Sequence, residues 1–282
     1  MALIGGGAAS ALYADNFVVS YNAAGSQVAN PTTLCSTATI CWVGEETFGT
    51  GAASTPSSTT PAAYTVLANK NVTGNGDISG TYSKGFQYYK ADQYGGAGGT
   101  GDYAEVKGNW TPHAYSLTLT TSGNLPGVNY FGLWFSALDA NNQLEFYEVV
   151  GTTRTLVETF TTADFIALVG SCPSGYTGGT GAVPGKPFCG NPNDGYQDNH
   201  EQFAFLNFYD SNGYFNEIDF TEINGVGAGF ESDNHSVGYG NPITPEGTII
   251  GGATPEPGTF ALFGSGLLGL AGLVRRRIGR RA

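Results

Sequence analysis

The chain has little charge and few helix-forming patterns. Only 12% of its 282 residues are charged, and it contains a single Met. Runs with a 3.6-residue apolar period are missing before the C-terminal segment, so a helix-rich fold is not expected. Glycine is abundant instead, with 44 residues, and aromatic residues make up 13% of the chain. This composition favours strands and turns.

The sequence also lacks the motifs of common catalytic sites. His113, His200 and His235 are isolated from one another, and neither a G-x-S-x-G nor an H-E-x-x-H motif occurs. Glu217 and Asp219 could share one face of a strand, as hydrolytic carboxylates in a cleft do. Their apolar neighbours favour an ordinary solvent-facing strand instead. We therefore assign no catalytic residue and predict that the protein is not an enzyme.

Basic residues are scarce before the C-terminus. Five of the eleven stand at the end of the chain, namely Arg275, Arg276, Arg277, Arg280 and Arg281. The other six face 22 acidic residues between Asp15 and Glu246, which gives that stretch a net charge of −16. A field of this sign repels phosphate backbones and excludes nucleic acid as a partner. It suits solubility outside the cell, or divalent cations.

Four cysteines form two local pairs, Cys35 with Cys41 and Cys172 with Cys189. Four cysteines allow three connectivities, of which we predict nearest-neighbour pairing. Neither pair has the short C-x₂₋₄-C spacing of a zinc site. Structural disulfides would place the protein in an oxidising compartment.

The N-terminal segment has the composition of a targeting signal. Residues 1–14 are small and apolar, and they contain the patterns Ala9-Ser10-Ala11 and Leu12-Tyr13-Ala14. They are similar to the end of a secretory signal peptide. The basic segment that opens such a peptide is missing, so either the true start lies upstream or Met1 is internal. A frayed N-terminus is the alternative.

The C-terminal segment has three parts. Pro255-Glu256-Pro257 precedes the uncharged run Gly258–Val274, and the arginine cluster follows. As a helix, this run spans about 25 Å, which is short for a hydrocarbon core. We predict one transmembrane helix at 258–274, with the arginines on the cytoplasmic side and the rest of the chain outside.

These three parts, in this order, resemble the PEP-CTERM sorting signal of Gram-negative bacteria. The resemblance covers residues 255–282 and takes Pro255, Glu256 and Pro257 as the processing motif. It implies recognition by an exosortase, a membrane-embedded protease that cuts near this motif. The ectodomain would then pass from the inner membrane to the cell surface or extracellular matrix.

Three segments of the body also resemble the exosortase-dependent surface proteins of cyanobacteria and other exopolysaccharide producers. They are Asn141–Glu148, Glu201–Glu222 and Gly229–Gly238. That family has no established reaction chemistry, so the resemblance implies a surface role without a mechanism.

Alternation with a period of two predicts strands through most of the body. They are Tyr115–Thr120, Tyr130–Leu138, Leu144–Val150, Leu156–Phe160, Phe203–Tyr209, Phe215–Ile223, Gly225–Phe230 and His235–Tyr239. The first four are expected to form a meander, and Asp210–Gly213 to close a hairpin. We predict an all-β fold, a β-sandwich of jelly-roll type, with one short helix at Thr162–Val169 that Gly170 ends.

The predicted parts are a signal-peptide remnant at 1–14, an ectodomain at 15–241, a flexible stalk at 242–254 and the sorting signal at 255–282. Gly49–Pro61 and Gly95–Gly101 are too rich in small and turn-forming residues to be regular structure.

Two acidic segments have the oxygen ligands that calcium prefers. They are Asn191–Asp198 and Glu231–Asn234, both expected to be loops. The predicted ligands are Asp194, Asp198, Glu231 and Asp233. Alternatively, these residues cap turns through their own backbone. No other cofactor is expected.

Six aromatic residues that could stack on sugars gather in one polar third of the body, namely Tyr82, Tyr88, Tyr89, Tyr94, Tyr103 and Trp110. The first functional hypothesis is a surface or matrix protein that acts in adhesion or organises extracellular polysaccharide in a biofilm. The alternative is a displayed carbohydrate-binding module. A polysaccharide-active enzyme, the third hypothesis, requires two close acids at the floor of a cleft.

Overall fold

The computed structural model describes residues 17–49, 56, 58–139, 141–173, 181–223 and 228–250, all within one compact unit of the chain. The strands are β1 (Phe17–Tyr21), β2 (Ile40–Glu46), β3 (Thr60–Pro61), β4 (Thr65–Lys70), β5 (Ile78–Tyr82), β6 (Gln87–Lys90), β7 (Asp102–Lys107), β8 (Ala114–Thr121), β9 (Tyr130–Leu138), β10 (Asn142–Val150), β11 (Thr153–Thr161), β12 (Cys189–Asn191), β13 (Gln197–Asp210), β14 (Glu217–Glu222), β15 (Gly229–Asn241) and β16 (Thr248–Ile249). The helical elements are α1 (Pro31–Leu34), η1 (Ala97–Gly99), α2 (Thr162–Val169) and η2 (Pro192–Asp194).

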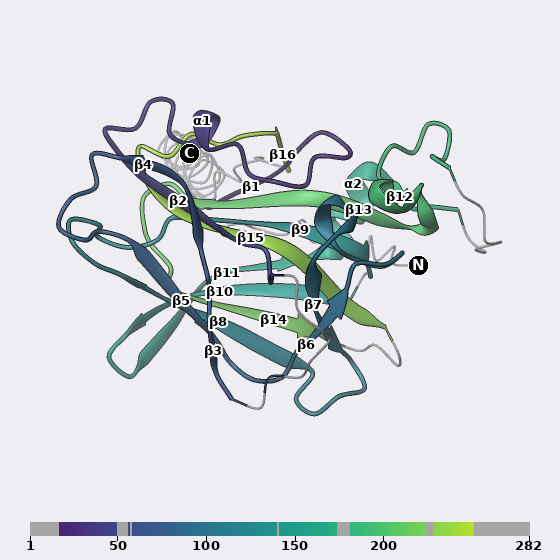
Figure 1. Cartoon of the computed structure of the whole chain (residues 1–282), viewed down its shortest axis with the longest axis horizontal. Helices are drawn as coiled ribbons and strands as arrows, with labels where there is room; N and C mark the ends of the chain where they lie inside the picture. The colour runs from purple at the N-terminus through teal and green to yellow at the C-terminus, as the bar shows by residue number, and fades with distance from the viewer. Residues whose placement is uncertain are drawn as a thin grey trace, which may run out of the picture. The chain divides into compact units, whose positions relative to one another are not determined.

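The strands form two antiparallel sheets that pack face to face. The larger sheet has the order β16-β1-β13-β9-β15-β2-β4, with β12 beside β13, and β7 joining β15 to β6. The smaller has the order β11-β10-β14-β8-β5-β3. Figure 1 shows the central strands of the larger sheet above those of the smaller. The predicted β fold with a short helix is confirmed, and its jelly-roll type stays a prediction.

The larger sheet is buried on both faces. On β9, Phe131 and Leu133 lie in the core between the sheets, whereas Tyr130 and Trp134 belong to a second apolar cluster on the outer face. This second cluster includes Leu34 of α1. The smaller sheet exposes its outer face, because β10 alternates between buried and less buried positions as a half-buried strand should. Only the larger sheet therefore needs a cover on its outer face.

The predicted strand pairing is only partly right. β10 and β11 form a hairpin through Gly151, as the third and fourth strands of the predicted meander should. The predicted meander is wrong, because β9 pairs with β13 and β15, and β8 pairs with β14 and β5. The predicted hairpin at Asp210–Gly213 is also wrong, because the chain there crosses from β13 in one sheet to β14 in the other. Alternation identifies strands, but it does not identify their partners.

The predicted loop Glu231–Asn234 is a strand interior instead. β15 is one strand whose first part pairs with β7 and whose later part pairs with β2, while β9 lies on its other side. The register with β9 shifts between Asp233 and Ser236, and Asn234 has a φ of 48°. The turn-forming residues of this segment therefore form a β-bulge within the strand. Residues 224–227, which include the start of the predicted strand Gly225–Phe230, lie outside the described residues.

Helix α2 has the predicted bounds. Gly170 ends it with a φ of 82°, a conformation that favours glycine. The Thr161 hydroxyl donates to the Asp164 carboxylate at 3.1 Å, and no side chain caps the helix backbone. The two segments predicted to be irregular each hold one short element, β3 and η1.

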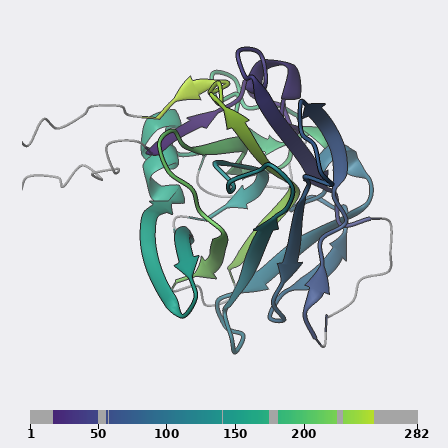
Figure 2. The ribbon, with the colours of Figure 1, turned by 90° about the vertical axis from the view of Figure 1, so that its left-hand side faces the viewer.

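The predicted stalk is part of the folded unit up to residue 250. β16 pairs with β1, beside which Figure 2 shows it, and Ile243 and Ile250 are buried. Glu246, also buried, accepts hydrogen bonds from the Asn30 backbone N–H at 3.0 and 3.1 Å. Residues 242–250 therefore help to cover the larger sheet, and the predicted ectodomain boundary at 241 is too early.

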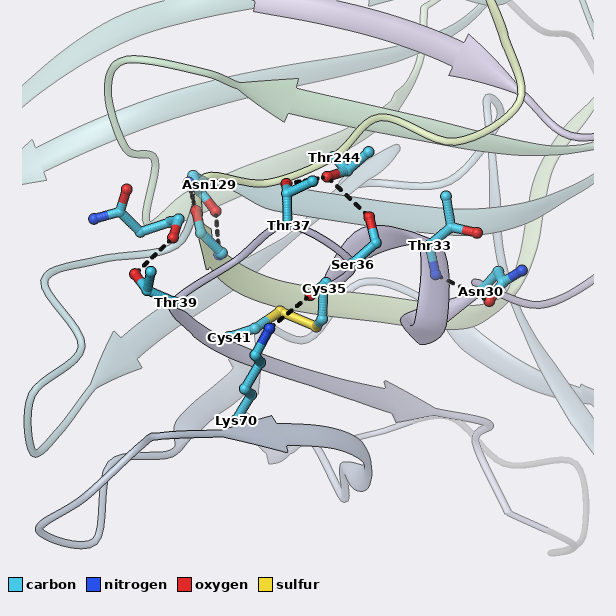
Figure 3. Close-up of a disulfide and its surroundings, with 12 residues drawn as sticks. Asn30, Thr33, Cys35, Ser36, Thr37, Thr39, Cys41, Lys70, Asn129 and Thr244 are labelled. Atoms are coloured by element: carbon cyan, nitrogen blue, oxygen red, sulfur yellow. Dashed lines mark hydrogen bonds between the residues drawn. A yellow bond between two sulfur atoms is a disulfide. The ribbon is translucent and has the colours of Figure 1, made fainter.

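Both predicted disulfides are present, Cys35–Cys41 and Cys172–Cys189. Figure 3 shows the first, with Lys70 Nζ 3.5 Å from the Cys35 carbonyl oxygen and Thr37 bonded to Thr244. This disulfide lies in the outer apolar cluster and fixes the segment that covers the larger sheet.

In the part of the chain that the structure describes, no helix has the length and apolar character to cross a membrane. The predicted signal-peptide remnant at 1–14, the PEP motif, the transmembrane helix at 258–274 and the arginine cluster lie outside the described residues.

Candidate functional site: an acid pocket

Buried carboxylates set this protein apart from an ordinary sandwich. Among the described residues, eleven Asp and Glu side chains are buried, whereas no Lys or Arg is. They are Glu45, Glu46, Asp102, Glu105, Glu158, Asp198, Asp210, Glu222, Glu231, Asp233 and Glu246. Burial disfavours the charged form of a carboxylate unless donors or cations offset it. A place where several carboxylates gather without donors is therefore a candidate site.

Such a place is a pocket of about 370 Å³ where β6, β7 and the first part of β15 meet the end of β9 and the early part of β13. Its lining residues are Tyr89, Asp92, Tyr94, Tyr103, Glu105, Lys107, Ala137, Asp139, Glu201, Ala228, Gly229 and Glu231. We call it the acid pocket, because its wall holds five carboxylates and one lysine. Figure 1 shows β6 and β7 beside the beginning of β15.

Two carboxylates oppose each other at the base of this arrangement. Glu105 on β7 and Glu231 on β15 are paired directly in the sheet register. A Cβ on Gly229 would lie 2.1 Å from Glu231 Oε1 and 2.8 Å from Glu105 Oε1, so the missing side chain leaves room for both. Burial, and then Glu105, raises the pKa of Glu231 well above its usual value. The two acids can both ionise here only at a cost in stability, because like charges directly opposite each other destabilise a sheet, so the pair needs a reason other than stability.

Aromatic rings and the lysine form the neighbouring wall. The rings of Tyr89 and Tyr103 stack at 5.9 Å, and the Tyr103 hydroxyl donates to Asp92 at 3.2 Å. Lys107 Nζ lies 3.3 Å from Glu105 Oε1 and 5.5 Å from the centre of the Tyr89 ring. Tyr94 is 43% exposed. Ring faces beside oxygen acceptors can hold a polyhydroxylated or cationic group.

A second group of polar side chains adjoins the pocket on β13. Asp198 is only 1% exposed, and its Oδ1 atom lies 2.8 Å from His200 Nδ1. His200 Nε2 lies 3.6 Å from Glu201 Oε1, and Glu201 also lines the pocket. Burial, and then Asp198 and Asp139, raises the pKa of Glu201 to about 9. The pKa of Asp139 is also raised, by burial and then by Asp198.

The structure does not bring the four predicted calcium ligands together as one set. Asp198 joins His200 and Glu201, and Glu231 faces Glu105 in the pocket. Asp233 accepts hydrogen bonds from the Ala97 and Asn234 backbone N–H groups, at 2.8 and 2.7 Å. Asp194 lies in η2, whose N-cap Asn191 accepts from Asn193 N–H as the turn-capping alternative expects.

Glu217 and Asp219, the acidic pair weighed for catalysis, lie on the outer face of the smaller sheet. Arg154 Nε is 2.5 Å from Glu217 Oε1, and Arg154 Nη2 is 2.5 Å from Asp219 Oδ2. The guanidinium carbon also lies 3.1 Å from the centre of the Tyr147 ring. Both carboxylates of this pair bind the one guanidinium on an exposed surface, and the pair lies outside the pocket lining.

The six predicted sugar-stacking rings divide between core and pocket. Tyr82 is buried and belongs to the core, where its hydroxyl lies 3.0 Å from His235 Nδ1. Tyr89, Tyr94 and Tyr103 line the pocket. Tyr88 and Trp110 are half-buried and pack against the core. Lys107 Nζ lies 5.9 Å from the centre of the Trp110 ring. Buried His235 is a core residue, and burial lowers its pKa to about 3.

Sequence reasoning missed several pocket residues, including Glu105, Lys107 and Asp139. Tyr103, Glu105 and Lys107 alternate on β7, and this was the available signal. It does not reveal that Glu105 would face Glu231, because the pairing of β7 with β15 joins residues more than a hundred positions apart.

Comparison with known proteins identifies the tail and leaves the body without a match. Residues 253–277 match the family described as the PEP-CTERM protein-sorting motif. No curated protein and no solved structure matches the chain. The predicted sorting signal is thus confirmed, and it marks the chain as an exported surface protein that is targeted to exosortase.

Proposed function

We propose, from the PEP-CTERM sorting motif at residues 253–277, that exosortase processes this exported protein and that the body then acts at the cell surface or in the extracellular matrix. The body would contribute to adhesion or to the organisation of extracellular polysaccharide. It would act by binding, because the sequence contains no nucleophile motif and its acidic charge suits an extracellular setting. The sorting motif is the observation that carries this proposal.

Intact mass and localisation test the route directly. The chain is expressed in an exosortase-bearing host and in the same host without that protease. We expect loss of a C-terminal fragment that begins near Pro255, and a body found outside the cell, only when exosortase is present. An uncleaved chain held in the inner membrane of both hosts would mean that the tail is a plain anchor.

Carbohydrate binding is the second candidate function, and the acid pocket favours it. Tyr89 and Tyr103 offer ring faces, Tyr94 is exposed, and Glu105 and Glu231 are acceptors for sugar hydroxyls. Sugar-binding sites combine these two kinds of group, since a sugar ring has an apolar face and hydroxyls around it. The pocket would then be the part of the body that holds the matrix.

A polysaccharide pull-down with matched variants tests this candidate. Tyr94→Ala removes a pocket ring, whereas Tyr214→Ala removes a similarly exposed tyrosine outside the acid pocket. We expect the first variant to lose retention and the second to keep it. Equal retention of both would contradict pocket binding. Release of reducing sugar that stops in Glu231→Gln would instead reveal an enzyme.

A further inference from the structure

We infer that Asp198, His200 and Glu201 form a binding site for one divalent transition-metal ion of the zinc class, beside the acid pocket. The inference concerns residues that the proposed function does not use as a set, and it does not depend on that function. Glu201 alone is shared, because it also lines the pocket.

The first observation is the geometry of the three side chains. One ligand atom from each lies within 4.8 Å of the others, which a single ion can bridge. All three come from the early part of β13, so one short segment of backbone positions them. β12 pairs with this segment, and Cys189 in β12 is paired with Gln202, next to Glu201. The Cys172–Cys189 disulfide thus braces the strand that carries the group.

The second observation is a pair of carboxylate oxygens without donors. Asp198 Oδ2 and Glu201 Oε2 are both buried and have no hydrogen-bond partner, and the Asp198 side chain is 1% exposed. Leaving such an atom unsatisfied is costly, unless something positive reaches it. Asp139 adds a third carboxylate to the same surroundings. A divalent cation would supply positive charge to both of these oxygen atoms.

The ligand types select the class of metal. Calcium prefers six to eight oxygen ligands, whereas an imidazole nitrogen with two carboxylates suits zinc and its neighbours. Three protein ligands leave one position of a tetrahedral shell open. Because Glu201 lines the pocket, that position would be accessible to water or to an oxygen atom of a pocket ligand. This set differs from the calcium ligands expected from sequence and shares only Asp198 with them.

The test is a calorimetric titration of the full chain, solubilised in mild detergent and stripped with a chelator, using zinc chloride alone and calcium chloride in parallel. We expect one zinc ion per chain, bound more tightly than calcium. Loss of a residue that only supports a metal ligand weakens metal binding by roughly 10- to 100-fold. His200→Ala and the nearly isosteric Glu201→Gln each remove a ligand, so each should weaken zinc binding by at least as much. His113→Ala, which removes an exposed imidazole elsewhere, should leave the affinity unchanged.

Circular dichroism and thermal unfolding verify that each variant is folded. The inference is overturned if zinc binds without saturation, or if His200→Ala and Glu201→Gln bind as the unaltered chain does. Equal weakening by His113→Ala would also overturn it, because binding would then be a general property of surface imidazoles. Metal analysis of the chain purified without chelator is an independent test. We expect nearly one zinc ion per unaltered chain and no zinc in His200→Ala.

Discussion

Glu217 and Asp219 on β14 and Glu105 and Glu231 in the acid pocket are acidic pairs in opposite settings. The first pair shares Arg154 on the exposed face of the smaller sheet, and each carboxylate has its own guanidinium nitrogen. The second pair is buried, and its two side chains lie opposite each other on the neighbouring strands β7 and β15. Lys107 Nζ lies 3.3 Å from Glu105 Oε1 and forms an ion pair with Glu105 alone. Strand register therefore places two acids on a shared arginine in one sheet and opposite each other in the other sheet.

This difference separates a structural use of charge from a functional one. An exposed ion pair contributes little to stability and its loss is easily tolerated. A buried pair of acids without sufficient cations opposes folding, and it persists where binding or catalysis uses it.

Removing the Cys172–Cys189 disulfide should be the most damaging change, because it braces the strand beside the pocket. The Cys172–Cys189 disulfide joins residues 17 positions apart and should contribute about 3 kcal/mol to the free energy of unfolding. The Cys35–Cys41 disulfide joins residues 6 positions apart and should contribute about 2 kcal/mol. Urea unfolding of the two double Cys→Ser variants measures both. Hydrogen exchange should also rise along residues 197–203 in the first variant alone. Equal exchange in both variants would contradict the bracing role.

Stability should fall as the pH rises, opposite to the usual behaviour of paired carboxylates. Burial raises the pKa of Asp233 from 3.8 to about 8, and the pKa of Glu231 is raised as well. Between the unfolded and the folded pKa, the folded chain binds more protons than the unfolded chain. The stability that these protons contribute is fully present below about pH 4. It is lost as the pH rises through the folded pKa, and the free energy of unfolding should then fall by roughly 2 kcal/mol or more.

Chemical unfolding of the chelator-treated protein across this pH range measures the effect. Asp233→Asn should flatten the profile, because the titrating group is gone. Asp219→Asn on the Arg154 face should flatten it less, because burial raises the pKa of Asp219 but Arg154 lowers it. A profile that rises from acid to neutral pH would show that the buried acids are ionised and paired.

Glu231→Gln should increase stability, because it removes a carboxyl group whose ionisation burial and Glu105 oppose, and it keeps the shape of the side chain. We expect a gain of about 1 kcal/mol that grows with pH. The matched variant Glu217→Gln loses an ion pair and should be less stable by under about 1 kcal/mol. Thermal unfolding of both variants gives the signs. Destabilisation by Glu231→Gln would mean that the pocket carboxylate is a structural element.

Arg154→Met should have the smallest effect. The ion pairs are exposed, so their loss should cost at most about 1 kcal/mol, and the cost should shrink as salt is added. Unfolding at low and high ionic strength separates this charge contribution from the packing of the side chain on Tyr147. A loss that stays constant with salt would assign the effect to packing.

Sequence reasoning recovers the local structure better than the contacts. Alternation and capping residues locate β9 and α2 with the bounds that the structure has, because these signals lie within one segment. It fails where a distant partner decides the outcome. Glu231–Asn234 has the composition of a loop but forms a bulged strand between β9 and its neighbours, and residues 242–250 have the composition of a linker but cover the larger sheet.

The candidate site follows the same rule. Tyr89, Tyr94, Tyr103 and Glu231 could be selected by residue type before the fold was known. The opposition of Glu105 and Glu231 could not, because it depends on the register of β7 and β15. His200 carried no sequence signal either, since a lone histidine outside a metal motif is uninformative.

Retention of the processed protein in the extracellular matrix tests most directly that the acid pocket is the binding surface. The chain is expressed in an exosortase-bearing host as the unaltered protein, as Tyr94→Ala/Glu231→Gln and as the matched control Tyr214→Ala/Glu217→Gln. All three should be cleaved near Pro255. We predict that the pocket variant is released into the medium while the unaltered protein and the control stay with the matrix. Equal retention of the pocket variant would contradict the assignment of the pocket as the binding surface.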